Sequence, residues 1–212
     1  MLLWSPCLCV RFYSVKPITK FLTSAIDAAH FPVPGAPEIA FLGRSNVGKS
    51  SLLNSLVGTT IARVSNTPGR TQMINFFGVN FKPDQPKPEL LLVDLPGYGY
   101  AKAPKEVVTQ WSKFIDPYLR EREPLALCIA LVDVSVPPQQ SDVRLLDFLR
   151  ASEREFIVVG TKSDRLSGNK LRSAVKELEQ GLGASPILPF SSKTGDGKAE
   201  LWRAIRGAYS PK

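Results

Sequence analysis

Residues 43–50 place glycine, lysine and hydroxyl groups at a spacing that binds phosphate. Their order is Gly43-Arg44-Ser45-Asn46-Val47-Gly48-Lys49-Ser50, which fits the pattern G-x-x-x-x-G-K-[ST]. Such a loop turns backbone N–H groups toward the α- and β-phosphates of a nucleotide, and its lysine reaches the β/γ oxygens. The final hydroxyl can ligate Mg²⁺. The pattern therefore predicts a nucleoside triphosphate site, with Lys49 as a catalytic residue and Ser50 as a metal ligand.

The residues on either side of this loop support the prediction. An apolar run at 38–42 predicts a strand, and residues 51–57 place leucines at helical spacing. A loop that leaves a strand and opens a helix presents N–H groups and a positive dipole end to an anion. We expect Ser51, at the start of this helix, to contact the nucleotide as well.

A second motif, Asp94-Leu95-Pro96-Gly97, follows an apolar run at 90–93. In a D-x-x-G motif at the end of a buried strand, the carboxylate holds a Mg²⁺-bound water and the glycine N–H meets a γ-phosphate. We therefore predict that Asp94 binds Mg²⁺ through water and that Gly97 is a catalytic residue.

Two further motifs point to guanine rather than adenine. The segment Thr161-Lys162-Ser163-Asp164 is a T-K-x-D variant of the guanine-reading pattern N-K-x-D. A carboxylate such as Asp164 can accept both N1–H and the exocyclic amine of guanine, a donor pair that adenine lacks. The stem of Lys162 can lie over the base. Later in the chain, Ser191-Ser192-Lys193 can bring a backbone N–H, that of Ser192, to the guanine O6.

Between the first helix and the next strand, residues 67–72 read as a loop, Thr67-Pro68-Gly69-Arg70-Thr71-Gln72. A threonine there can complete the Mg²⁺ shell through its hydroxyl and touch the γ-phosphate through its N–H. We predict that Thr71 does so, with Thr67 as the second choice, and that Gly69 also contacts GTP.

The elements that must position these motifs alternate between strands and helices from residue 38 onward. Continuous apolar runs at 90–93, 127–132 and 156–159 are typical of parallel strands covered on both faces. The short proline-rich connection at 82–88 leaves no room for a crossover helix, so strands 73–81 and 90–93 should be antiparallel. We predict an α/β P-loop NTPase fold with a six-stranded, mostly parallel sheet, one antiparallel strand and late helices at 169–182 and 198–209. No second domain is apparent.

Composition and charge narrow the function classes. The chain has 212 residues, a net charge of +8 and three cysteines, too few for a disulfide framework. Residues 170–212 carry twice as many bases as acids, which suits contact with RNA, although a basic surface without a partner would look the same. No apolar stretch is long enough to span a membrane. We expect Cys128, inside an apolar run, to be a small buried hydrophobe.

Residues 1–20 form a separate extension that is basic and lacks acidic residues. This composition is typical of an organellar transit peptide. It predicts a location in the mitochondrial matrix, and a bacterial-type cytoplasmic protein is the alternative.

The phosphate loop, the segment Asn66-Thr67-Pro68-Gly69-Arg70-Thr71-Gln72 and the segment Asp94-Leu95-Pro96-Gly97-Tyr98-Gly99-Tyr100-Ala101 together resemble the EngB family of GTPases. The resemblance covers the chain from about Phe21 to about Tyr209. It implies a Ras-like G domain at 21–212 that binds GTP and GDP with Mg²⁺ and acts in assembly of the large ribosomal subunit, here the mitochondrial one. We expect a monomer. Two alternatives stay open: a nucleotide-gated RNA-binding module with incidental hydrolysis, and another RNA-related GTPase.

The resemblance also allows a prediction of the intrinsic rate of GTP hydrolysis. Ras-like enzymes hold a water-orienting glutamine just after D-x-x-G, where this chain has Tyr98, so we expect slow intrinsic hydrolysis. In GTPases with a similar phosphate loop, an asparagine at the position of Asn46 helps to coordinate K⁺. Asn46 is therefore a candidate K⁺ ligand, or else a residue that only shapes the loop.

Overall fold

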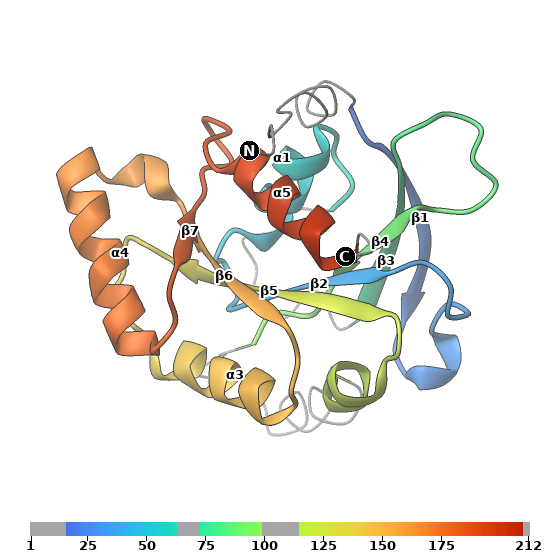
Figure 1. Cartoon of the computed structure of the whole chain (residues 1–212), viewed down its shortest axis with the longest axis horizontal. Helices are drawn as coiled ribbons and strands as arrows, with labels where there is room; N and C mark the ends of the chain where they lie inside the picture. The colour runs from blue at the N-terminus through green and yellow to red at the C-terminus, as the bar shows by residue number, and fades with distance from the viewer. Residues whose placement is uncertain (1–15, 63–72, 99–114, 210–212) are drawn as a thin grey trace, which may run out of the picture.

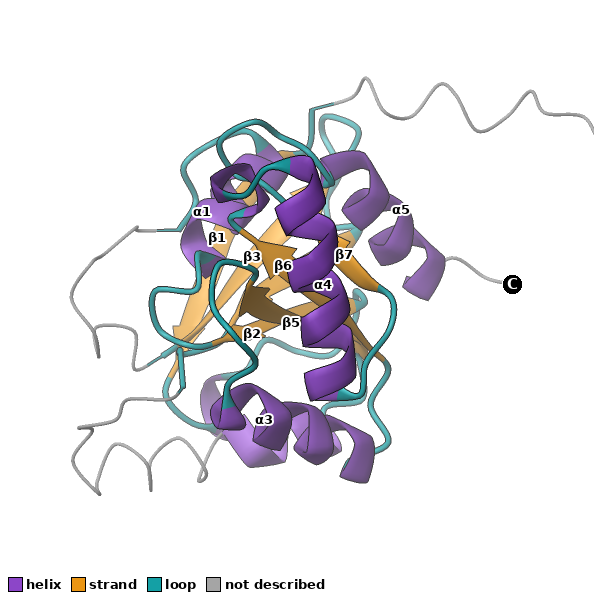
Figure 2. Cartoon of the chain, turned by 90° about the vertical axis from the view of Figure 1, so that its left-hand side faces the viewer, coloured by secondary structure: helices purple, strands orange, loops and turns teal. Residues whose placement is uncertain are grey.

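The computed structural model describes residues 16–62, 73–98 and 115–209, which form a seven-stranded sheet with helices on both faces (Figures 1 and 2). The strands lie in the order β1-β3-β4-β2-β5-β6-β7. Their bounds are β1 Ile18–Ala25, β2 Glu38–Gly43, β3 Ile74–Asn80, β4 Leu90–Asp94, β5 Leu125–Asp133, β6 Phe156–Thr161 and β7 Ile187–Pro189. The helices include α1 Lys49–Val57, α3 Gln140–Ala151, α4 Gly168–Leu182 and α5 Lys198–Tyr209, and residues 115–121 are also helical. Short 3₁₀ turns lie at Ala28–His30 and Ser163–Arg165.

The strand directions confirm the predicted α/β class. Strands β4, β2, β5, β6 and β7 are parallel along the sheet, whereas β3 pairs antiparallel with both β4 and β1. Within the described sheet, β3 is thus the one strand that runs against the rest. The prediction that the strands on either side of the proline-rich connection are antiparallel was therefore correct.

The predicted number of six strands was wrong, because the sheet also contains β1. This strand lies at the edge of the sheet and most of its side chains are exposed or half-buried, so the segment Ile18–Ala25 lacks the continuous apolar run of the inner strands. It begins at Ile18, and the last three residues of the predicted extension thus belong to the sheet.

Both faces of the sheet are buried, and strand β2 shows why. All six of its residues are buried, with Ile39 and Phe41 in the core on one face and Ala40 and Leu42 in the core on the other. Leucines of α1 and α5 cover the first face, and leucines of α3 and α4 cover the second (Figure 1). This arrangement explains the near-continuous apolar runs in the sequence.

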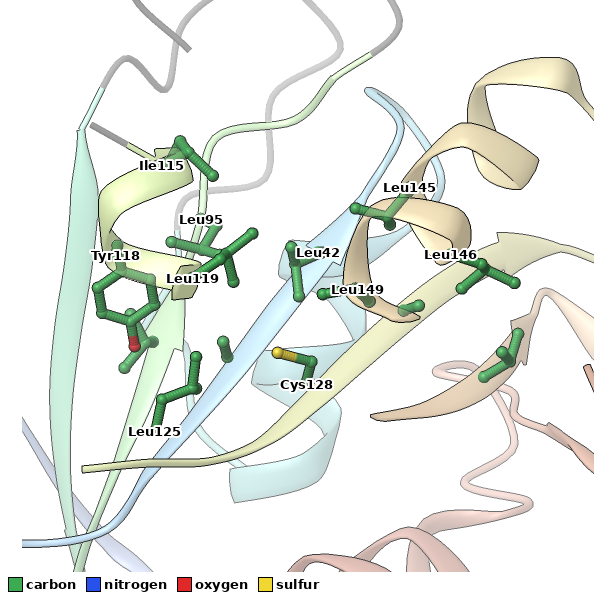
Figure 3. Packing of buried hydrophobic residues seen from close by; sticks show 14 of the residues in the cluster. Leu42, Leu95, Ile115, Tyr118, Leu119, Leu125, Cys128, Leu145, Leu146 and Leu149 are labelled. Carbon is green, nitrogen blue, oxygen red and sulfur yellow. The ribbon is translucent and has the colours of Figure 1, made fainter. Parts of the chain in front are cut away.

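Figure 3 shows the core beneath α3, where Leu42, Cys128 and Leu149 lie close together. Cys128 is fully buried, and burial raises the pKa of its thiol to about 12. It is the small buried hydrophobe that the sequence predicts. Among the described residues, no helix is long and apolar enough to cross a membrane.

Candidate nucleotide-binding site

The predicted motifs meet because parallel strands end at the same edge of the sheet. Pairing aligns Phe41 of β2 with Asp94 of β4, and Asp133 of β5 with Thr161 of β6. The loops that follow these strands carry the phosphate loop, D-x-x-G and T-K-x-D. In open α/β sheets, ligands bind outside the carboxyl ends of the strands.

The phosphate loop has a backbone that fits its predicted role. Gly48 has φ of 105°, in the left-handed region, and helix α1 begins directly after it at Lys49. An L side chain is strained in this conformation, so glycine suits the position. Asn46 also has a positive φ, of 63°, a conformation that asparagine tolerates better than most residues. This geometry supports the interpretation that Asn46 shapes the loop.

Lys49 and Asp94 form an ion pair, and only 9% and 4% of these residues is exposed. The residue predicted to bind the triphosphate and the residue predicted to bind a Mg²⁺-bound water are therefore in direct contact. Asp94 and Ser50 offer carboxylate and hydroxyl oxygens, the ligand type that Mg²⁺ prefers. Among the described residues no cluster of three His, Cys, Asp or Glu side chains could hold a metal. The oxygens of Asp94 and Ser50 suit Mg²⁺, which is usually held by one or two protein oxygens together with phosphates and water.

Thr161, the first residue of the T-K-x-D motif, contacts the phosphate loop. Only 2% of the residue is exposed, and its hydroxyl oxygen lies 2.6 Å from the carbonyl oxygen of Val47 and 3.0 Å from that of Val132. The hydroxyl can therefore donate to the phosphate loop. In this structure Thr161 joins the guanine motif to the loop that holds the phosphates.

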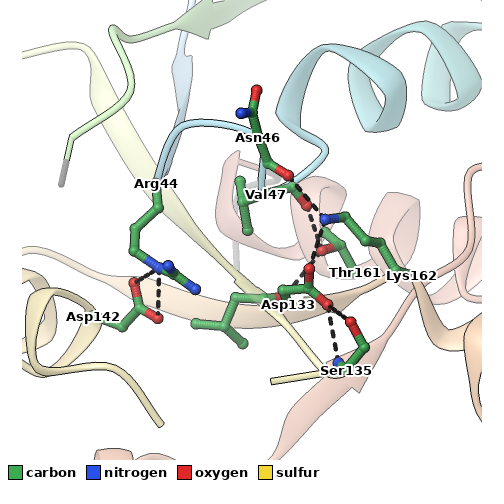
Figure 4. A network of polar contacts seen from close by, with 9 residues as sticks. Arg44, Asn46, Val47, Asp133, Ser135, Asp142, Thr161 and Lys162 are labelled. Carbon is green, nitrogen blue, oxygen red and sulfur yellow. Dashed lines mark hydrogen bonds and ion pairs between the residues drawn. The ribbon is translucent and has the colours of Figure 1, made fainter. Parts of the chain in front are cut away.

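Lys162 reinforces the same connection (Figure 4). Its ammonium donates to the backbone oxygen of Asn46 at 2.8 Å and to a carboxylate oxygen of Asp133 at 2.5 Å. Ser135 binds the other oxygen of Asp133 through its N–H and its hydroxyl. Burial alone would raise the pKa of Asp133, but the hydrogen bonds from Lys162 and Ser135 outweigh it, so the pKa lies below its ordinary value.

Ser191 holds the residues around Asp164, the predicted guanine acceptor, in place. Its hydroxyl donates to Oδ1 of the exposed Asp164 at 2.7 Å, and it accepts the backbone N–H groups of Lys193 and Thr194. Ser191 itself is fully buried, so it orients the carboxylate rather than facing the base. A carboxylate has about four acceptor positions, which leaves capacity on Asp164 for two donors of a guanine ring.

Asp142, which the sequence analysis did not single out, binds two residues of the site. The Nε of Arg44 lies 3.1 and 3.3 Å from its two carboxylate oxygens, and the hydroxyl of Tyr98 donates to Oδ1 at 3.1 Å. Burial raises the pKa of Asp142, and the Arg44 charge opposes this shift. Burial and the nearby Asp142 charge also raise the pKa of Tyr98 well above its ordinary value. No sequence pattern marks Asp142 as functional, since it lies within an amphipathic helix.

The described residues thus include the predicted phosphate loop with Ser51, Asp94 and Gly97, the T-K-x-D motif and Ser191 to Lys193. Gly69, Thr71 and the second choice Thr67 lie outside the described residues. Asp133 was also missed, although its place at the end of a long apolar strand could have drawn attention to it.

Comparison with known proteins identifies the family. The sequence profile of a family described as "50S ribosome-binding GTPase" matches residues 38–162. The "Probable GTP-binding protein EngB" of Koribacter versatilis is 56% identical over 191 residues, which cover 90% of this chain and 94% of that protein. Its counterpart in Acidobacterium capsulatum is 54% identical over 186 residues, which cover 88% of each chain. A crystal structure of "a probable GTP-binding protein engB" matches with a TM-score of 0.63 and 24% identity over 81% of this chain and 97% of that one, which supports the fold.

These relatives also correct the predicted location. Both are bacterial proteins, as is a further EngB relative from Myxococcus xanthus, and they match this chain over nine-tenths of its length. The mitochondrial location was therefore wrong, because a basic, acid-poor start is a statistical signal that other N-terminal segments share. The relatives point to the alternative, a bacterial-type cytoplasm. The matched profile, the two highly similar relatives and the site geometry agree, and the chain belongs to the EngB family of GTP-binding proteins, P-loop enzymes that hydrolyse GTP.

Proposed function

We propose that this protein is a guanine-nucleotide switch that binds the large ribosomal subunit or its precursor during assembly. The match of residues 38–162 to 50S ribosome-binding GTPases carries this proposal, because that range contains the phosphate loop, D-x-x-G and the start of T-K-x-D. The excess of bases in the last fifth of the chain suits contact with ribosomal RNA.

In the bound state, backbone N–H groups of residues 43–50 would hold the α- and β-phosphates, and Lys49 would leave Asp94 to reach the β/γ oxygens. Asp164 would accept the two guanine donors. Ser50 would hold Mg²⁺ directly, Asp94 would hold it through water, and Thr71 would complete the shell. The metal supplies neutralisation of the negative charge on the β- and γ-phosphates. Gly97 would offer its N–H to the γ-phosphate.

We also propose that hydrolysis by the isolated protein is slow. The hydroxyl of Tyr98 donates to Asp142, and like an ordinary tyrosine hydroxyl it is protonated at neutral pH. A phenol in this state cannot take a proton from an attacking water. This observation also favours the second candidate function, a nucleotide-gated ribosome-binding module whose hydrolysis is incidental.

Asn46 is proposed as a K⁺ ligand as well, since its side chain is exposed and its amide oxygen suits a hard monovalent cation. Turnover measured in K⁺ and in Na⁺ tests this idea, and equal rates would remove it.

Co-sedimentation with purified large subunits and their precursors tests the proposed function. The wild-type protein should sediment with the particles more strongly with a non-hydrolysable GTP analogue than with GDP. Lys49→Ala should lose this difference, because it removes the ammonium that reaches the β/γ oxygens. Lys87→Ala, at an exposed site in the β3–β4 connection, is the matched control and should behave as wild type. Equal sedimentation with the GTP analogue and with GDP would contradict a nucleotide switch.

Single-turnover hydrolysis with and without the particles then separates the two candidates. Acceleration by the particles supports a hydrolytic switch, and an unchanged slow rate supports the binding module.

A further inference from the structure

Two separate sets of side chains hold the phosphate loop, and Figure 4 shows them on opposite sides of it. Thr161 and Lys162 bind the backbone oxygens of Val47 and Asn46, in the middle of the loop. Asp142 binds the side chain of Arg44, near the start of the loop. Only the second set also includes a residue that follows D-x-x-G, namely Tyr98.

The carboxylate of Asp142 is firmly placed. It lies in the first turn of α3, only 2% of the residue is exposed, and Leu145 and Leu149 of the same helix are buried in the core. It accepts from Arg44 through both oxygens and from Tyr98 through one. The Nε–H of Arg44 is shared between the two oxygens, and a hydrogen bond between two charged groups is stronger than one between neutral groups. Asp142 therefore ties two segments of the site to a helix in the core.

The same two segments are also joined through their backbones. The N–H of Tyr98 donates to the oxygen of Gly43 at 3.3 Å, and the N–H of Ser45 donates to the oxygen of Tyr98 at 3.2 Å. These bonds form a parallel bridge between Arg44 and Tyr98. Strand pairing thus resumes beyond the end of β4. It resumes at Arg44 and Tyr98, the two residues whose side chains both contact Asp142.

A bulge lies between this bridge and the regular pairing of β2 with β4. Phe41 pairs with Asp94, and Arg44 pairs with Tyr98, so four steps along one segment oppose three along the other. The extra residue lies within Leu95–Gly97. A Cβ at Gly97 would come within 2.9 Å of the Ser45 hydroxyl oxygen and 3.2 Å of the Ser45 nitrogen. Gly97 is therefore packed directly against the phosphate loop, and its position depends on both ends of the bulge.

We propose that Asp142 is a positioning residue for GTP hydrolysis: it holds Arg44 and Tyr98 together, and thereby keeps Gly97 in place beside the phosphate loop. The inference rests on the proposed contact between the Gly97 N–H and the γ-phosphate. Thr161 and Lys162 hold the middle of the phosphate loop independently of Asp142. Asp142 therefore acts on the γ-phosphate side of the site and does not affect the binding of GDP.

The test compares Asp142→Asn and Tyr98→Phe with wild type in the full chain. For each protein, the affinities for GDP and for a non-hydrolysable GTP analogue are measured by calorimetry, and kcat and KM by steady-state hydrolysis. We expect kcat to fall on the order of tenfold in both variants, because small displacements of a positioned group cost factors of ten to a hundred. GDP affinity should stay within about twofold of wild type, since Thr161 and Lys162 still hold the loop. Asp147→Asn, at an exposed position on the same helix, is the matched control and should leave every value unchanged.

The double variant gives a second criterion. If Asp142 acts through Tyr98, the combined loss in kcat should be smaller than the product of the two single losses. Tyr98→Phe removes only a hydroxyl, so it keeps the test decisive if Asp142→Asn folds poorly. The proposal is overturned if both single variants hydrolyse GTP at the wild-type rate. It is equally overturned if GDP affinity and melting temperature fall together with kcat, since that result means a general structural role.

Failure of this inference is distinct from failure of the proposed function. Association of the wild-type protein with large subunits is measured without either variant. If the wild-type protein does not bind the particles, the proposed function is refuted. The role of Asp142 in hydrolysis is not affected by that result.

Discussion

Replacing Thr161 by valine should weaken binding of GDP and GTP together. Valine has nearly the same shape as threonine, but it removes the hydroxyl that lies 2.6 Å from the Val47 oxygen and 3.0 Å from the Val132 oxygen. The site is almost fully buried, so water cannot easily replace the lost donor. Leaving a buried polar group unsatisfied costs about 1–3 kcal/mol.

Part of this free energy should be lost from nucleotide binding, and the rest from the stability of the fold. We expect the affinity for both nucleotides to fall by about tenfold, which corresponds to about 1.4 kcal/mol. The remainder should appear as a melting temperature lower by a few degrees, since about 1 kcal/mol shifts a domain of this size by about 2–4 °C.

Calorimetric titration with GDP and with a GTP analogue, and a thermal scan of the nucleotide-free protein, measure both effects. Thr161→Ser keeps the hydroxyl and is the matched control, which should stay close to wild type in affinity. Unchanged affinity in the valine variant would refute the reasoning. So would a loss of guanine preference without a loss of phosphate affinity, because Thr161 would then contact the base.

Three other substitutions test separate parts of the site. Asp164→Asn should weaken GTP binding by at least about 100-fold, because a carboxylate that accepts two donors is replaced by an amide that accepts fewer. Xanthosine triphosphate, which has an oxygen in place of the exocyclic amine, should bind this variant better than GTP does, and an unchanged preference for GTP over ATP would contradict the assignment. Gly97→Ala should weaken binding of a GTP analogue several-fold more than binding of GDP in calorimetry, since its Cβ would press on Ser45; equal losses would argue against a γ-phosphate contact. Asp133 has a lowered pKa in the folded state, so its ionisation stabilises the fold above the ordinary value of 3.8, and this contribution is lost as the pH falls through the folded pKa. Urea unfolding should therefore show wild type more stable than Asp133→Asn at about pH 7 and the two converging in acid, whereas a constant difference would count against the Lys162 and Ser135 contacts.

The positions of motifs that are local in the sequence, at the ends of strands, could be predicted. Lys49, Asp94 and Asp164 belong to short patterns that each follow an apolar strand, and parallel strands bring their ends together without further information. The antiparallel β3–β4 pair also followed from a local cue, the short proline-rich connection.

Contacts between distant positions could not be predicted in the same way. Arg44 and Asp142 are 98 positions apart, and nothing in the helix that carries Asp142 distinguishes it from an ordinary solvent-facing acid. Thr161 and Val47 are 114 positions apart, and no local pattern indicates that the buried hydroxyl of Thr161 turns toward the phosphate loop. Strand β1 was missed because an exposed edge strand has a weak hydrophobic pattern.

Calorimetric titration of the purified wild-type protein with GTP and with ATP, both with Mg²⁺, tests the central claim most directly. If Asp164, oriented by Ser191, reads the guanine ring, GTP should bind at least about 1,000-fold more tightly than ATP, because a site built to pair with two donors rejects a base that lacks them. Equal affinity for the two nucleotides would contradict the account.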